Sequence, residues 1–139
     1  MALVSEEKIA ALDILYARIS RAAEAMGGKA APRLAAIAFR GAEFAIPQTE
    51  AVNALLVEMP DGLRVELIPA HPLSIGNVVS VRAERRHAGG RKNDWAFNFV
   101  NGEWRATQSP LSDDEIRKCL TPEGPPPIYE RGPRGSSRS

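Results

Sequence analysis

The sequence predicts an α+β fold in which a long N-terminal helix packs on an antiparallel β-meander of about five strands. Three observations predict it. Residues 6–26 carry apolar side chains at helical spacing, residues 54–106 alternate between polar and apolar positions, and Asn101-Gly102 is a dipeptide favoured in type I′ hairpin turns. We treat residues 1–121 as a single α+β domain and residues 122–139 as a disordered tail rich in proline, glycine and arginine.

The N-terminal helix is predicted between Ser5, a good N-cap, and the stop signal Gly27-Gly28. Its apolar positions follow a spacing of three and four residues: Ile9, Leu12, Tyr16, Ile19, Ala23 and Met26, widened by Leu15 and Ala22. Such a stripe requires a partner, and we expect it to cover the apolar face of the sheet. A further possibility is that the helix also pairs with a second copy of itself in a homodimer.

Residues 29–53 allow two interpretations. Pro32 can open a short second helix over residues 33–40 that ends at Gly41, and we favour this reading. The alternation of apolar residues around Gly41 also fits a strand with a bulge. We expect residues 48–53, after Pro47, to form a turn or a single helical turn.

Two hairpins and one intervening strand make up the predicted meander. In the first hairpin, the P-D-G turn at residues 60–62 joins strands over 54–59 and 63–68. A strand over residues 77–86 follows. In the second hairpin, a two-residue turn at Asn101-Gly102 sets Phe99 opposite Trp104 and places five apolar side chains on one face: Trp95, Phe97, Phe99, Trp104 and Ala106.

A short C-terminal helix is predicted from the capping-box pattern S-x-x-E at Ser112 and Glu115. Ile116, Cys119 and Leu120 form its apolar stripe. We therefore expect Cys119 to be a small buried side chain rather than a nucleophile.

Composition and motifs narrow the classes of function. With one cysteine, no apolar run near 20 residues and no signal-peptide pattern, the expected location is the cytoplasm. His71 and His87 do not share metal-ligand spacing with Cys119, and no glycine-rich phosphate loop or catalytic motif occurs. We therefore expect a non-enzymatic protein without a cofactor or metal. An enzymatic or ligand-binding α+β cone with a cavity near Trp95 and Trp104 is a weaker alternative.

Basic charge is concentrated in residues 82–92, where five cations and one acid give +4 in a chain with a net charge of +1. These cations occupy a strand end and the loop after it, a placement typical of basic fingers that contact nucleic-acid phosphates. The predicted contact residues are Arg82, Arg85, Arg86, Arg91 and Lys92. A solvated hairpin tip without a ligand explains the same pattern.

The tail contains Pro126-Pro127-Ile128-Tyr129, which resembles the P-P-x-Y ligand of WW domains. This resemblance implies a WW-type partner that contacts Pro126, Pro127 and Tyr129. A protein–protein adaptor that acts through this tail or through a sheet edge is therefore the alternative to a nucleic-acid-binding protein. A proline-rich spacer is the simpler interpretation of the tail.

Overall fold

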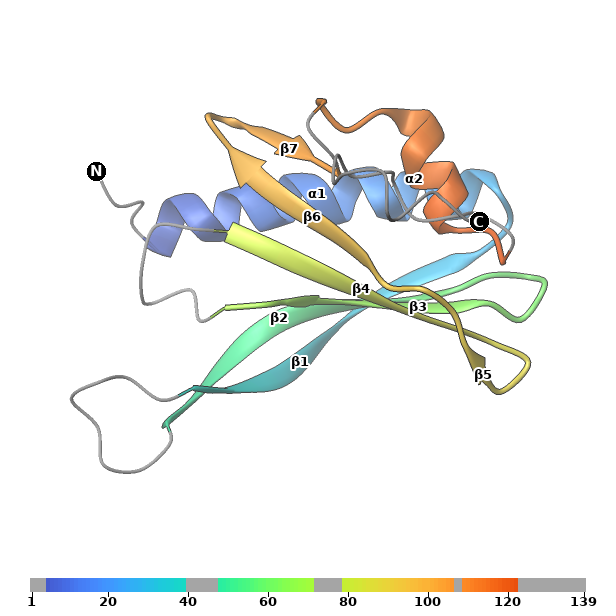
Figure 1. The fold of residues 1–139 in the computed structure, drawn as a ribbon, viewed down its shortest axis with the longest axis horizontal. Coiled ribbons are helices and arrows are strands. Elements are labelled where there is room, and N and C mark those ends of the chain that lie inside the picture. The colour runs from blue at the N-terminus through green and yellow to red at the C-terminus, as the bar shows by residue number, and fades with distance from the viewer. Residues whose placement is uncertain (1–4, 40–47, 72–78, 107–108, 123–139) are drawn as a thin grey trace, which may run out of the picture.

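Two helices lie on one side of a single antiparallel sheet in the computed structural model, which describes residues 5–39, 48–71, 79–106 and 109–122 (Figure 1). The helices are α1 (Ser5–Ala25) and α2 (Asp113–Cys119). The strands are β1 (Lys29–Phe39), β2 (Gln48–Glu58), β3 (Arg64–Pro69), β4 (Val79–His87), β5 (Gly90–Arg91), β6 (Trp95–Val100) and β7 (Glu103–Arg105). The predicted α+β architecture is confirmed.

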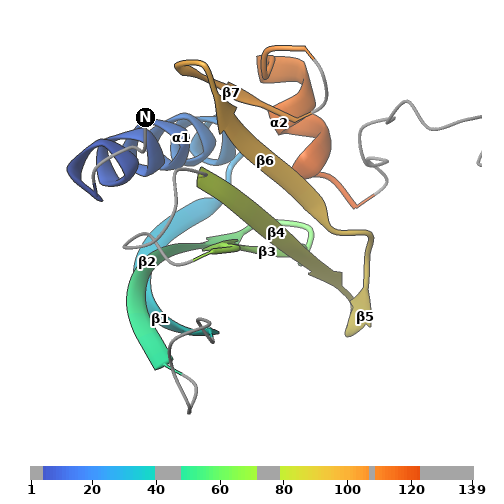
Figure 2. The ribbon, with the colours of Figure 1, turned by 60° about the vertical axis from the view of Figure 1, so that its left-hand side comes forward.

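The sheet is a meander with strand order β1-β2-β3-β4-β6-β7, in which β5 pairs only with β4. All of these pairs are antiparallel. The β1–β2 hairpin has the longest strands of the sheet, and it curls away from the helices (Figure 2). One face is covered by α1 and α2, and we call the other the open face.

The short helix favoured for residues 33–40 is wrong, because Lys29–Phe39 is a strand that pairs with Gln48–Glu58 along its whole length. The expected turn at residues 48–53 is wrong for the same reason. Alanine favours helices, but an eleven-residue ladder to β2 supplies backbone hydrogen bonds that local propensity does not anticipate. Pro32 is compatible with this position because β1 is an edge strand, where a missing N–H disrupts no central ladder.

Both predicted hairpins are confirmed. Asn101 and Gly102 have φ angles of 52° and 83°, as a type I′ turn requires, and Phe99 pairs with Trp104. In the first hairpin, Gly62 has a φ of 98°, and the Asp61 side chain accepts a hydrogen bond from the backbone N–H of Leu63. The turn residues therefore predicted both hairpins and, in the second, the register of the strands.

The core lies between α1, α2 and the covered face of the sheet. Trp95, Phe97 and Trp104 are buried there, and the indole N–H of Trp104 donates to the backbone carbonyl of Ala11 at 2.8 Å. The apolar stripe of α1 thus packs on the sheet, as expected, and the structure gives no support for pairing with a second copy of the helix. Ile9 is an exception to the predicted stripe, because it is 42% exposed.

Helix α2 begins as its capping box predicts. The Ser112 side chain accepts from the Glu115 backbone N–H, and the Glu115 carboxylate accepts from the Ser112 backbone N–H. Ile116 and Cys119 are buried, and burial raises the pKa of the Cys119 thiol from 9.0 to about 12. The thiol is therefore neutral near pH 7, which agrees with a packing role.

Candidate functional site

Strand β4 divides the predicted basic cluster between the two faces of the sheet. Its side chains alternate, so Val81, Ala83 and Arg85 are buried on the covered face, while Arg82 and Arg86 are exposed on the open face. The sequence grouped these arginines by proximity along the chain. In the structure, the side chain of Arg85 points to the covered face, and those of Arg82 and Arg86 point to the open face.

Arg85 does not fit the predicted role of a phosphate contact, because its side chain is only 1% exposed. Its guanidinium donates to three backbone carbonyls: Cys119 at 2.9 Å, Asn93 at 3.1 Å and Thr121. It also lies 6.0 Å from the centre of the Trp95 ring. Burial lowers the pKa of Arg85, yet an arginine keeps its charge at neutral pH. Arg85 therefore fixes the end of α2 to the sheet.

The segment after β4 is a tight hairpin rather than an extended flexible loop. Ala88 and Gly89 have φ angles of 55° and 80°, and Gly90–Arg91 pairs back onto Arg86 and His87. This pairing places Arg91 directly opposite Arg86. Lys92 follows, is half-buried, and donates its backbone N–H to the carbonyl of Arg85.

Three arginines lie side by side across neighbouring strands of the open face. Arg64 of β3 pairs in register with Arg86 of β4, which in turn pairs with Arg91 of β5. We call Arg64, Arg86 and Arg91 the arginine row. Like charges directly opposite one another destabilise a sheet, so the three guanidiniums repel one another.

The members of the arginine row differ in their partners. Arg64 lies 3.6 Å from the Glu58 carboxylate, and Arg91 forms a 3.0 Å ion pair with Asp94; in each pair the arginine side chain is more than half exposed. Arg86, in the middle, is exposed and has no ion pair or side-chain hydrogen bond within the described part of the chain. Arg64 and Arg91 are therefore in surface ion pairs, and Arg86 is the member of the row whose forked donors have no carboxylate partner among the described residues.

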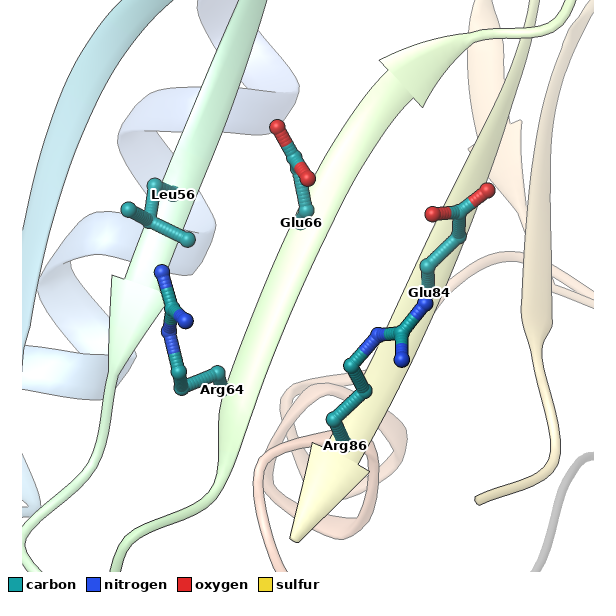
Figure 3. A pocket seen from close by; sticks show the side chains of 5 residues that line it. All are labelled: Leu56, Arg64, Glu66, Glu84 and Arg86. Atoms are coloured by element: carbon teal, nitrogen blue, oxygen red, sulfur yellow. The ribbon is translucent and has the colours of Figure 1, made fainter. Parts of the chain in front are cut away.

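An acidic row lies next to the arginine row. Glu66 pairs in register with Glu84, and both point to the open face beside Arg64 and Arg86 (Figure 3). Together with Leu56 these side chains line a shallow hollow with a volume of about 80 Å³. The hollow is too small for a drug-sized ligand.

Arginines on the outer side of the acidic row compensate its carboxylates. Arg33 contacts Glu66 at 3.0 Å, and Arg82 contacts Glu84 at 2.7 Å. Arg82, a predicted contact residue, is therefore already paired within the sheet. The carboxylates of Glu66 and Glu84 thus pair with the outer arginines, although they line the same hollow as Arg64 and Arg86.

The structure changes the membership of the predicted site. Arg86 and Arg91 are neighbours, as a shared site requires, and Arg64 of β3 lies beside Arg86. Arg85 is buried and does not belong to the site. Sequence reasoning missed Arg64, although the P-D-G hairpin and the strand at 77–86 were both predicted. Pairing those two strands in register would have identified it. The predicted partner contacts Pro126, Pro127 and Tyr129 lie outside the described residues.

Other candidate chemistry gains no structural support. Trp95 and Trp104 lie in the packed core, and the nearby space lined by Ile19, Phe97 and Ile116 has no room for a water molecule. Among the described residues, no three His, Cys, Asp or Glu side chains are placed to hold a metal ion. Within the same residues, neither helix is long and apolar enough to cross a membrane.

Comparisons with known proteins supply no further lead. No protein-family model matches the chain, and no curated protein or solved structure matches it with significance. The open face of the sheet is therefore the basis for assigning a function.

Proposed function

We propose that this chain is a non-enzymatic binding protein that contacts the phosphates of nucleic acid through the arginine row on the open face of its sheet. The observation that carries the proposal is Arg86, an exposed guanidinium without a partner among the residues that the structure describes, held between Arg64 and Arg91 by strand pairing. Guanidiniums offer forked donors that match phosphate oxygens.

The arrangement suits a backbone contact rather than reading of bases. Adjacent strands lie about 4.8 Å apart, so the three arginines present a short line of positive charge. The phosphates of a nucleic-acid strand are also closely spaced, with one for about every 3.4 Å of duplex axis, and binding them relieves the repulsion within the row. No aromatic side chain belongs to the row, which favours phosphate contacts over stacking on bases.

The test is a titration of labelled mixed-sequence duplex and single strand at about 20 mM and about 150 mM salt. The test variant is Arg64→Gln/Arg86→Gln/Arg91→Gln. We expect the parent to bind with an affinity that falls steeply with salt. Because each neutralised phosphate contributes roughly 0.7 to 0.9 to the slope of log affinity against log salt, the variant should lower that slope by about 2 to 3.

A matched control removes the same charge from the opposite side of the molecule. Arg21→Gln/Arg117→Gln/Lys118→Gln changes three exposed cations on α1 and α2. The proposal predicts that this control binds almost as the parent does. Equal losses in both variants would assign binding to overall charge, and no binding of the parent at low salt would overturn the proposal.

A further inference from the structure

Among the residues that the structure describes, no strand besides β2 pairs with β1, which leaves a long edge of the sheet open. It is the first strand in the order β1-β2-β3-β4-β6-β7 and runs for eleven residues, about 35 Å of backbone (Figure 2). The opposite edge is different, because β7 has three residues and Arg105 forms a further bridge with Pro110. An edge as long as β1 is a template for another strand.

One face of β1 is entirely apolar. Alternation places five side chains on it, at every second position: Ala30, Pro32, Leu34, Ala36 and Ala38. Four of them are exposed, and Leu34 is 72% exposed, more than the other exposed large hydrophobic residues of the described chain. Edge strands usually carry charges that discourage pairing, and this face carries none.

We propose that β1 pairs with β1 of a second copy of this chain, forming an antiparallel homodimer about a two-fold axis at Leu34. Leu34 is the central residue of Lys29–Phe39, so this axis brings all eleven residues into register with their copies. Leu34 then lies opposite the partner's Leu34, and Pro32 opposite the partner's Ala36. The apolar faces of the two strands become one continuous patch.

The charges of β1 are compatible with this register. Arg33 lies opposite the partner's Ala35 and diagonal to the partner's Arg33, so no cation directly faces another. Arg33 also points to the open face, where it contacts Glu66 at 3.0 Å. A strand that is self-complementary about its own centre favours a second copy over an unrelated peptide.

The backbone supports the same register. Proline has no N–H, so Pro32 belongs at a position whose N points away from β2 and toward the free edge. Because every second residue of a strand directs its backbone groups to the same side, the N–H and C=O of Leu34 and Ala36 then also point to the free edge. A symmetric pair of such strands without proline would form about ten hydrogen bonds between the copies. Each Pro32 lacks an N–H, so this pair forms about eight.

The first experiment measures the mass of the full chain by sedimentation or light scattering from about 1 to about 200 µM. We expect a concentration-dependent dimer. Leu34→Lys places two like charges at the axis and should shift the protein to monomer at all these concentrations. Ile14→Lys, which adds the same charge at a 57% exposed position on α1, should leave the dimer intact.

A cysteine cross-link tests the register. Leu34→Cys brings two sulfurs together at the axis, where a Cα separation of about 5.5 Å permits a disulfide. Ala36→Cys leaves its two copies about four residues apart along the strands, too far to bridge. Cys119 is only 2% exposed, so the introduced thiol is the accessible one.

We expect Leu34→Cys, and not Ala36→Cys, to form a covalent dimer under mild oxidation. A protein that stays monomeric throughout the concentration range overturns the proposal, whether the edge is free or covered by another segment of the chain. A dimer that survives Leu34→Lys, or that cross-links equally through position 36, assigns the interface to another surface or register.

Discussion

Arg85→Met tests whether the buried arginine holds α2 onto the sheet. Methionine keeps much of the aliphatic length of the side chain but removes every donor. Three backbone carbonyls, those of Asn93, Cys119 and Thr121, then lose their hydrogen bond. Two of these carbonyls belong to the end of α2 and the residues just after it, so the substitution should loosen this end first.

The expected cost follows from the number of lost bonds. Each hydrogen bond to a charged donor contributes roughly 1.5 to 3 kcal/mol, which gives a gross loss of several kcal/mol. Removing a buried charge offsets part of this loss, because the folded state no longer holds a desolvated guanidinium. We therefore expect the free energy of unfolding to fall by about 2 to 4 kcal/mol, a large share of the roughly 5 to 15 kcal/mol typical of a domain.

Urea denaturation followed by tryptophan fluorescence is a suitable assay, since Trp95 lies beneath the guanidinium and is 2% exposed. Arg86→Met is the matched control. It changes an exposed neighbour on the same strand and should shift the free energy of unfolding by no more than about 0.5 kcal/mol. If Arg85→Met is as stable as the parent, the three carbonyls are satisfied in other ways and the anchoring role is wrong.

Two further predictions concern close packing and pH. A Cβ at Gly28 would lie 2.6 Å from the Met59 sulfur and 2.9 Å from the Glu58 carbonyl oxygen, so Gly28→Ala should cost about 2 kcal/mol in urea denaturation. Gly90→Ala, whose Cβ meets nothing nearer than 3.6 Å, should be nearly neutral, and equal costs would refute the packing argument. Burial raises the pKa of the Cys119 thiol from 9.0 to about 12, so the folded state binds the proton more tightly than the unfolded state. The contribution of the Cys119 thiol to stability is complete below about pH 9 and is lost as the pH rises to about 12, at up to roughly 1.4 kcal/mol per pH unit. Cys119→Ala should remove this loss. If the free energy of unfolding of the variant depends on pH as that of the parent does, the prediction is wrong.

Turns and caps that depend on a few adjacent residues were predictable from the sequence. Strand β1, which depends on pairing with a strand elsewhere in the chain, was not predicted. The Asn101-Gly102 turn and the Ser112 capping box each need only adjacent residues, and both were predicted correctly. Strand β1 carries only an ambiguous signal, because apolar alternation allowed a strand while its alanines favour helix, and its strand state comes from pairing with β2, nine or more residues away. Long-range pairing overrode local propensity there.

The candidate site shows the same limit in its side chains. Alternation along β4 already placed Val81 and Ala83 inward, and continuing it by two residues predicts Arg85 inward as well. The density of charge at residues 82–92 favoured a single exposed cluster instead. Arg64 became part of the site only through the register between β3 and β4, which joins residues 22 positions apart.

The two proposals share one geometric consequence. A two-fold axis between antiparallel edge strands stands perpendicular to the sheet, so the open faces of both copies lie on the same side of the dimer. Two arginine rows would then face one long polyanion together, and the second contact would be made at a high effective concentration. The proposals nevertheless depend on different surfaces. Loss of the arginine row leaves the β1 edge unchanged, and Leu34→Lys leaves each row in place, so a short single strand that reaches only one row separates the affinity of the row from the gain due to pairing.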